Sequence, residues 1–265
     1  MELAKAEPDS LPNDSGGAFA PGSVTRADLP DMPDGYKDAL VRLIAIQAYG
    51  EKLAASEGVE WIRDAPGWQE RRVYSKILSD EARHSAYLYK CLADIGVDEE
   101  EAMSIALGVS SRPTVPASMA GPLAINDSEN DWIDICLNMM LLDRAGRHMV
   151  ENYCTSSYAP FASANERILP DEGLHEGYGL TQFTLALNGG YDRDELAGKV
   201  TKWFAHGLNF FGPPKSRTHG QLREWGLKRK SNAEMREDYR SEVMQLLGDD
   251  ADDLVRFQSD GFPWS

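Results

Sequence analysis

Apolar and polar positions along most of the chain repeat with the period of an α-helix. From Pro33 and Asp34 to about Ser56, one stripe carries Leu40, Leu43, Ile44, Gln47, Ala48 and Glu51. Residues three and four apart lie on the same face of a helix, so this stripe predicts an amphipathic helix. Glu51 shares the apolar face, and its carboxylate is therefore expected to point toward the interior.

A second and longer helix is predicted from about Gly67 to Ile95, and Gly96 is well placed to end it. One face of this helix carries Ile77, Glu81, His84, Leu88 and Cys91. The acidic stretch that begins at Asp98 predicts a short helix to about Leu107, followed by a Pro- and Gly-bearing loop through Gly121.

The third predicted helix is capped by Ser128 or Asn130 and runs to about Tyr153. The fourth carries Glu172 and His175 and ends near Asn188. Pro170 allows two interpretations of the fourth helix. Its ring either starts the segment or lies inside a longer helix, where it removes one backbone hydrogen bond.

Two more helices are predicted in the C-terminal part. The fifth runs from about Asp192 to Asn209, and the aromatic residues near its end are expected in the core: Trp203, Phe204, Phe210 and Phe211. A basic stretch from Lys215 to Arg240 follows, which is either a solvated face or a site for an anionic ligand. Within it, Ser231 and Glu234 form a capping box that opens a sixth helix to about Leu247.

These elements predict an all-α helical bundle with additional C-terminal helices. Residues 1–31 are rich in Pro, Gly, Ser, Asp and Ala and are expected to form a flexible arm. Residues 32–247 form the bundle domain, and residues 248–265 form an acidic tail whose Phe262-Pro263-Trp264 end docks on the domain or on a partner.

Composition narrows the partners and the compartment. A chain of 265 residues can build one large domain, and no apolar run approaches the roughly 18 residues of a membrane span. The net charge of −16 disfavours nucleic acid and anionic membranes as partners. Three irregularly spaced cysteines and the lack of a visible secretory signal favour a cytoplasmic location with reduced thiols.

Candidate chemistry comes from two copies of one motif, Asp80-Glu81-Ala82-Arg83-His84 and Asp171-Glu172-Gly173-Leu174-His175. A Glu and a His three residues apart on a helix can bind one metal ion from a single turn. The preceding residues, Asp80 and Asp171, are expected to hydrogen-bond a metal-ligating His, since such a His usually donates its other ring N–H to a carboxylate.

Two further carboxylates lie at matching distances from the motifs. Glu51 comes 30 residues before Glu81, and Asp143 comes 29 residues before Glu172. Each interval fits one antiparallel helical hairpin. Glu51 and Asp143 would otherwise be solvated surface charges, but Asp143 follows the apolar run 133–142, where an unpaired carboxylate is costly to bury.

Four carboxylates and two imidazoles in a helical bundle are typical of a carboxylate di-iron centre. The predicted ligands are Glu51, Glu81, His84, Asp143, Glu172 and His175. This ligand set suits iron, with manganese as the alternative. Two such metals can bind and split O2, which side chains alone cannot do.

Seven segments resemble a known family: MPDGYKDALVRLIAIQAYGEKL, WIRDAPGWQERRVYSKILSDEARHSAYLYKCLADIG, LLDRAG, YCTSSYAPFA, DEGLHEGYG, FFGPPKSRT and WGLKRKSNAEMREDY. From about Met32 to Leu247 the chain resembles the catalytic A subunits of phenylacetyl-coenzyme A epoxidases. More distantly it is similar to the oxygenase component of benzoyl-coenzyme A epoxidase.

The resemblance implies a ferritin-like di-iron domain and the six ligands named above. It implies oxygen-atom insertion into an aromatic acyl thioester during phenylacetate catabolism, with electrons from a separate reductase and a non-catalytic sister subunit bound beside the catalytic one. Arg42, Lys228 and Asn232 match positions that hold the acyl-coenzyme A. Ile46 and Ile77 stand where Gln and Lys are expected, which leaves open another small carboxylic substrate.

Two other classes compete with the di-iron monooxygenase. The first is a ferritin-like iron oxidase or storage protein, although storage chains are usually shorter. The second is a non-catalytic sister subunit, which is expected to lack several ligands. The chain has no Gly-x-Gly-x-x-Gly and three scattered cysteines, so it is expected to need a separate reductase, and to work with a sister subunit or as a homo-oligomer.

Overall fold

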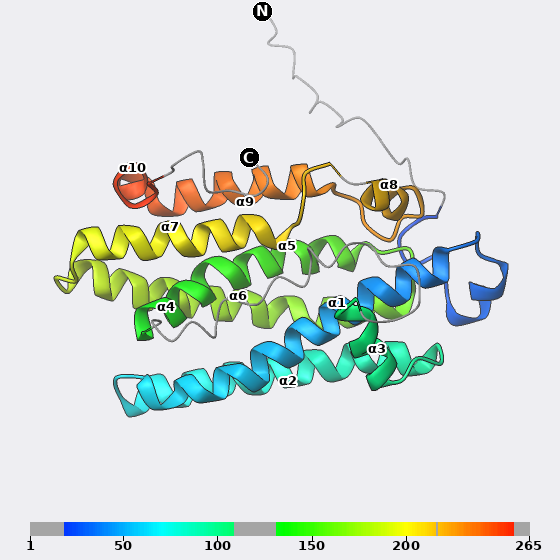
Figure 1. Cartoon of the computed structure of the whole chain (residues 1–265), viewed down its shortest axis with the longest axis horizontal. Helices are drawn as coiled ribbons and strands as arrows, with labels where there is room; N and C mark the ends of the chain where they lie inside the picture. Colours follow the sequence, from blue (N-terminus) through cyan, green and yellow to red (C-terminus); the bar gives the residue numbers. More distant parts are fainter. Residues whose placement is uncertain (1–18, 109–130, 216, 257–265) are drawn as a thin grey trace, which may run out of the picture.

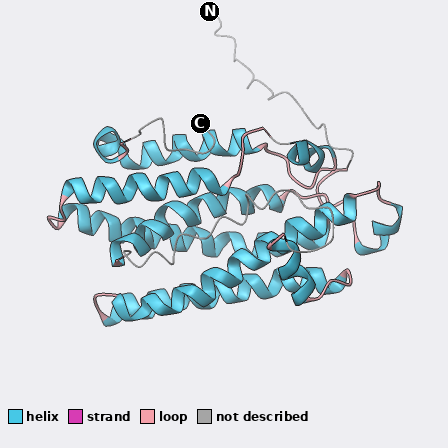
Figure 2. Ribbon diagram, viewed as in Figure 1, coloured by secondary structure: helices cyan, strands magenta, loops and turns pink. Residues whose placement is uncertain are grey.

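The computed structural model describes residues 19–108, 131–215 and 217–256. Within these ranges the regular structure is helical, with one isolated β-bridge between Val24 and Tyr158. Figure 2 shows helices throughout the described chain. The predicted all-α ferritin-like bundle is confirmed. Among the described residues, no helix combines the length and the apolarity that crossing a membrane requires.

Two antiparallel helical hairpins form the bundle (Figure 1). The first pairs α1 (Tyr36–Glu57) with α2 (Trp68–Asp94), and the 3₁₀ turn η2 (Gly58–Asp64) connects them. The second pairs α5 (Asp143–Cys154) with α6 (Ala159–Asn188). The short helix α3 (Glu99–Ala106) packs on α1, and the contact of α2 with α6 joins the two hairpins.

The third predicted helix is divided into three parts. Helix α4 (Trp132–Leu137) begins at Asp131, whose carboxylate accepts hydrogen bonds from Ile133 N and Asp134 N. The caps predicted from the sequence, Ser128 and Asn130, lie outside the described residues. One π-helical turn, η5 (Asn138–Leu142), then leads into α5 directly before Asp143. Such π turns are frequent at functional sites.

Close packing on α6 accompanies the π turn. A Cβ atom built on Gly179 of α6 would lie 2.5 Å from Met140 N and 2.6 Å from Cys136 O. Only a residue without a side chain therefore allows α6 to approach this backbone so closely. Pro170 lies inside α6, so the second of its two interpretations holds.

A further layer covers the second hairpin. Helix α7 (Arg193–Phe210) packs on η5 and α5, and α8 (Arg217–Glu224) and α9 (Asn232–Leu247) follow, the last opened by the predicted Ser231–Glu234 capping box. The 3₁₀ turn η6 (Gly248–Asp250) leads into α10 (Ala251–Leu254). Of the aromatic residues expected in the core, Trp203, Phe204 and Phe211 are buried, and Phe210 is 38% exposed.

Residues expected in the flexible arm and the tail contact the bundle where they are described. Val24 is buried, donates its N–H to Ser157 O at 2.9 Å and precedes the 3₁₀ turn η1 (Arg26–Asp31). At the other end, Leu254 is buried and Arg256 N donates to Thr201 Oγ1 at 2.9 Å. Residues 1–18 and the Phe262-Pro263-Trp264 end lie outside the described residues.

Candidate metal centre

The four long helices of the two hairpins bring the six predicted ligands into two overlapping groups. The first group contains Glu51, Glu81, His84 and Glu172, and the second contains Glu81, Asp143 and His175. Within each group, one ligand atom from every residue lies within 4.8 Å of the others. Glu81 belongs to both groups, so its carboxylate lies where it could contact two ions.

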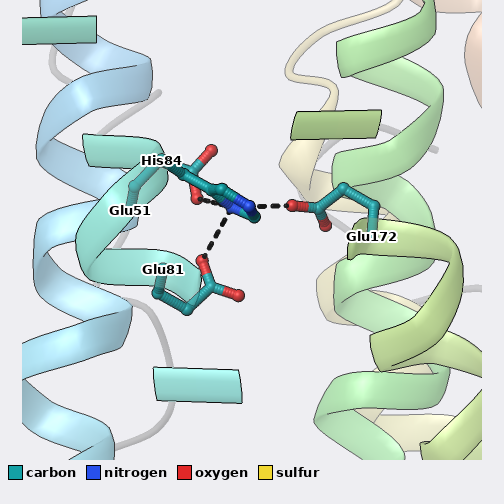
Figure 3. A group of neighbouring side chains, drawn as sticks. All are labelled: Glu51, Glu81, His84 and Glu172. Atoms are coloured by element: carbon teal, nitrogen blue, oxygen red, sulfur yellow. Dashed lines mark ion pairs between the residues drawn. The ribbon is translucent and has the colours of Figure 1, made fainter. Parts of the chain in front are cut away.

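His84 directs its Nδ1 atom at three carboxylates (Figure 3). The distances from Nδ1 are 3.4 Å to Glu172 Oε1, 3.5 Å to Glu51 Oε2 and 3.8 Å to Glu81 Oε2. His175 Nδ1 lies 3.0 Å from Glu81 Oε1. Both Nδ1 atoms are buried and lack a hydrogen-bond partner, as expected of atoms that serve as metal ligands.

The carboxylates crowd together in the interior, which disfavours the charged forms of Glu81, Asp143 and Glu172. Burial, together with the charges of Glu51 and Glu172, raises the pKa of Glu81 well above its ordinary value. Burial and the charges of Glu172 and Glu51 do the same to the pKa of Asp143. The pKa of Glu172 is raised to about 7, mainly by burial and against the influence of His84. Bound cations would relieve this repulsion.

The pKa values of the two imidazoles shift in opposite directions because their surroundings differ. Burial opposes protonation of His84, but Glu172 and Glu51 outweigh it and raise the pKa to about 10. Burial and the nearby charge of His84 lower the pKa of His175 to about 4. The same interaction with His84 keeps the pKa of Glu51 below its ordinary value despite its burial.

Each imidazole turns its other nitrogen toward the motif of the opposite hairpin. His84 Nε2 lies 3.1 Å from Asp171 Oδ2, a hydrogen bond, whereas His175 Nε2 lies 3.6 Å from Asp80 Oδ2. Arg83 connects the two aspartates, with an Nη2 atom 2.7 Å from Asp80 Oδ1 and 2.7 Å from Asp171 Oδ2. Sequence reasoning missed this role of Arg83, although the residue lies inside the first motif.

A second missed pair supports Glu51. Gln47 Nε2 donates to Glu51 Oε1 at 3.4 Å and to Asn165 Oδ1 at 2.9 Å. Gln47 therefore connects Glu51 on α1 to the buried Asn165 on α6. Its place one helical turn before Glu51 was a signal that could have identified it.

The three residues matched to acyl-coenzyme A binding lie in different surroundings. Lys228 and Asn232 are each 1% exposed, and Lys228 Nζ lies 3.4 Å from Asn232 Oδ1. Burial lowers the pKa of Lys228 to about 7. Arg42 is half-buried on α1. In this structure Lys228 and Asn232 thus lie in the interior rather than at the expected basic opening.

The residues present fit the metal ions that the ligand pattern implies. Carboxylates with imidazoles are the ligand set that iron and manganese prefer, and two orphaned Nδ1 atoms face the carboxylates. The fold and this cluster together define a class: a ferritin-like helical bundle with an interior carboxylate–histidine cluster that could hold metal ions.

Comparison with known proteins identifies the family of the chain. The family described as phenylacetic acid catabolic protein matches residues 25–250, and the chain belongs to this family. The chain is also similar to the A subunit of 1,2-phenylacetyl-CoA epoxidase of Escherichia coli (strain K12), with 26% identity over 209 residues. That alignment covers 78% of this chain and 65% of the relative, so the chain spans less than two thirds of that protein.

Proposed function

We propose that the chain is the catalytic subunit of a multicomponent di-iron monooxygenase, an epoxidase or hydroxylase. The position of Glu81 in both ligand groups carries the proposal, because a carboxylate between two ligand sets suits a pair of ions. Family membership and the similarity to an epoxidase subunit support an oxygenase.

The proposed roles follow from the grouping. Glu51, His84 and Glu172 would hold one iron, Asp143 and His175 would hold the other, and Glu81 would lie between them. When bound, the two ions would supply the O2 chemistry that oxidises the substrate. The chain's own contribution is to bury this cluster away from water and to fix the imidazoles through Asp80, Asp171 and Arg83.

We propose an aromatic or other acyl-coenzyme A thioester as the substrate. The name of the Escherichia coli relative supports this class. Lys228 and Asn232, whose Nζ and Oδ1 atoms lie 3.4 Å apart, would contribute polar contacts if the interior around them opened to the ligand. Arg42 would contribute a third contact. Ile77 is buried in a second, smaller apolar cluster with Tyr74 and Met139, so its side chain offers the thioester no polar contact. A small carboxylic substrate without coenzyme A is the alternative.

We further propose that the chain works with partners. A separate reductase would supply electrons, and a non-catalytic sister subunit or a second copy of the chain would complete the assembly. The relative's designation as one subunit of an epoxidase supports this arrangement. Within the chain, residues 32–247 would form the di-iron domain between the arm and the acidic tail. Free cysteines at positions 91, 136 and 154 fit the reducing cytoplasm.

Metal analysis and turnover test this function together. The purified chain, reconstituted anaerobically with Fe(II), should hold two iron ions and, with reductase and O2, should oxidise phenylacetyl-coenzyme A. Glu81→Ala should lose both iron binding and turnover, because both ligand groups lose a member. Asp238→Asn, on the exposed side of α9, should keep iron binding and turnover. Iron uptake into a mineral core without substrate oxidation would instead indicate storage.

A further inference from the structure

Helix α9 contributes no predicted metal ligand, yet one of its carboxylates contacts α5 through three side chains. Glu242 forms an ion pair with Arg144, and its two oxygens lie 2.6 and 2.7 Å from Arg147 Nη2. Glu242 Oε2 also lies 2.8 Å from His148 Nε2. Its pKa is lowered because the charges of Arg144 and Arg147 outweigh the effect of its partial burial.

The same two arginines also contact α6. Arg147 Nε donates to Glu176 Oε2 at 3.1 Å, and Arg144 Nη1 lies 3.5 Å from the same oxygen. Arg144, which is buried, donates its Nε to Met140 O in the π turn η5 at 3.2 Å. One polar bridge thus joins α9, α5, α6 and the π turn.

The ends of this bridge are next to predicted ligands. Arg144 follows Asp143 on α5, and Glu176 follows His175 on α6. Asp143 and His175 are the two residues that, with Glu81, form the second ligand group. A displacement of Arg144 or Glu176 would therefore also move the backbone of the predicted ligand beside it.

We infer that Glu242 is a positioning residue for the metal ion held by Asp143 and His175. This inference rests on the proposed function, because it assumes that the cluster binds metal. Glu242 balances the charges of Arg144 and Arg147 from the side of α9. The arginines consequently hold α5 and α6 at the separation that brings Asp143 and His175 to Glu81.

Loss of the Glu242 charge should draw the guanidinium groups of Arg144 and Arg147 toward α6. Arg147 would keep its ion pair with Glu151 on α5, whereas Glu176 contacts both guanidinium groups and would take over from Glu242 as their shared counter-charge. A buried guanidinium that loses one carboxylate is left under-compensated and is drawn toward the next. Glu176 would then be pulled toward α5, with His175 beside it. The resulting misplacement should weaken metal binding in the second ligand group more than in the first.

Metal titration of the full-length apoprotein tests the inference. Mn(II) is the probe, because free aqueous Mn(II) can be counted by its paramagnetic resonance signal. Glu242→Gln should weaken the binding of the second Mn(II) by about 10-fold, the lower end of the effect of losing a partner that orients a ligand. Glu242→Asp should recover part of the affinity because it restores the charge.

Two control variants on α9 separate positioning from general stability. Asp238→Asn removes an exposed ion pair with Lys230, and Val243→Ala removes buried apolar contacts and should lower the unfolding temperature. Both should keep the wild-type Mn(II) affinity. Arg147→Lys, which keeps the charge but loses the two-atom contact with Glu242 and Glu176, should reproduce the weakened binding and replaces Glu242→Gln if that variant does not fold.

The outcomes are distinct. Wild-type affinity for both ions in Glu242→Gln or Arg147→Lys would overturn the inference and leave the proposed function intact. Equal weakening in Val243→Ala would also overturn it, because the effect would then follow stability alone. Failure of the wild-type chain to bind Mn(II) or Fe(II) would overturn the proposed metal centre, and the positioning role with it.

Discussion

Asp171 Oδ2 on α6 lies 3.1 Å from Nε2 of His84 on α2, so the second motif supports a histidine of the first. The reciprocal contact, between Asp80 and His175, is longer at 3.6 Å. The two helical hairpins are thus linked through the motifs themselves. Arg83 lies 2.7 Å from both aspartates and limits their movement from the solvent side.

The Asp171–His84 contact leads to a prediction about metal affinity. Asp171→Asn keeps the shape of the side chain but removes the charge that orients the His84 ring and favours Nδ1 as the ligand atom. Metal affinity should fall by about 10–100-fold. Titration of the apoprotein with Fe(II) under anaerobic conditions measures the change.

Asp94→Asn is the matched control, because Asp94 is an exposed aspartate on α2 that pairs with Lys90 at 3.4 Å. It should bind iron as the wild type does. Asp80→Asn should have a smaller effect than Asp171→Asn because its contact with histidine is longer. Unchanged iron affinity in both motif variants would contradict the orienting role.

The helices could be predicted from the sequence because their apolar stripes are regular and their ends carry clear signals. The Ser231–Glu234 capping box, for example, opens α9 as predicted, and Asn188 ends α6. The interruption before Asp143 could not be predicted. The π turn is accompanied by a tertiary contact, the close approach of Gly179 to the backbone at Met140, and the local sequence does not reveal such a contact.

The candidate site, like the fold, has parts that the sequence predicts and parts that only tertiary packing shows. The six predicted ligands could be proposed because the spacing within a helical turn and between hairpin arms is expected to bring them together, and the structure brings these residues into two neighbouring groups. The bridge through Glu242 could not be found, because it joins residues more than 90 positions apart. Likewise, Lys228 looks like a surface cation in the sequence, but in the structure it is buried, with its Nζ near Met149 on α5 and Asn232 on α9.

A substitution at Gly179 tests the packing beneath the π turn. Gly179→Ala would place a methyl group 2.5 Å from Met140 N, and backbone atoms cannot move away easily. We expect the free energy of unfolding to fall by about 1–3 kcal/mol, as is usual for overpacking. Urea denaturation followed by circular dichroism measures it.

Gly177→Ala provides the control on the same helix, since a Cβ atom there meets nothing within 4 Å. Alanine favours helix more than glycine does by about 1 kcal/mol, so this variant should be slightly more stable than the wild type. If both variants behaved alike, the close approach of α6 to Met140 would not constrain the structure.

The buried amine of Lys228 predicts a dependence of stability on pH. Burial lowers its pKa from 10.5 to about 7, so between these values the unfolded chain binds more protons than the folded one. Stability therefore rises with pH across this window, by at most about 1.4 kcal/mol per pH unit from this group. Lys228→Met should lose that rise.

The measurement is urea denaturation of both proteins at pH 7, 8 and 9. The difference between wild type and Lys228→Met isolates the contribution of the amine from that of other titrating groups. An equal difference at all three pH values would show that the amine keeps its proton in the folded protein.

Turnover assays give a second prediction for this residue. Lys228→Ala should raise KM for a coenzyme A thioester more than it lowers kcat, if the amine contributes binding alone.

The last prediction concerns the electrons that the proposed oxygenase requires. The sequence offers neither a Gly-x-Gly-x-x-Gly motif nor four cysteines for an iron–sulfur cluster, and splitting O2 at a pair of ferric ions needs two electrons. With a net charge of −16, the chain should attract a reductase that presents a basic surface. Reductase-driven turnover should then fall as salt rises, because screening shortens the reach of that attraction. Peroxide-driven turnover, which needs no docking, should stay constant over the same salt series. Salt-insensitive, NAD(P)H-driven turnover by the purified chain alone would refute the need for a separate reductase.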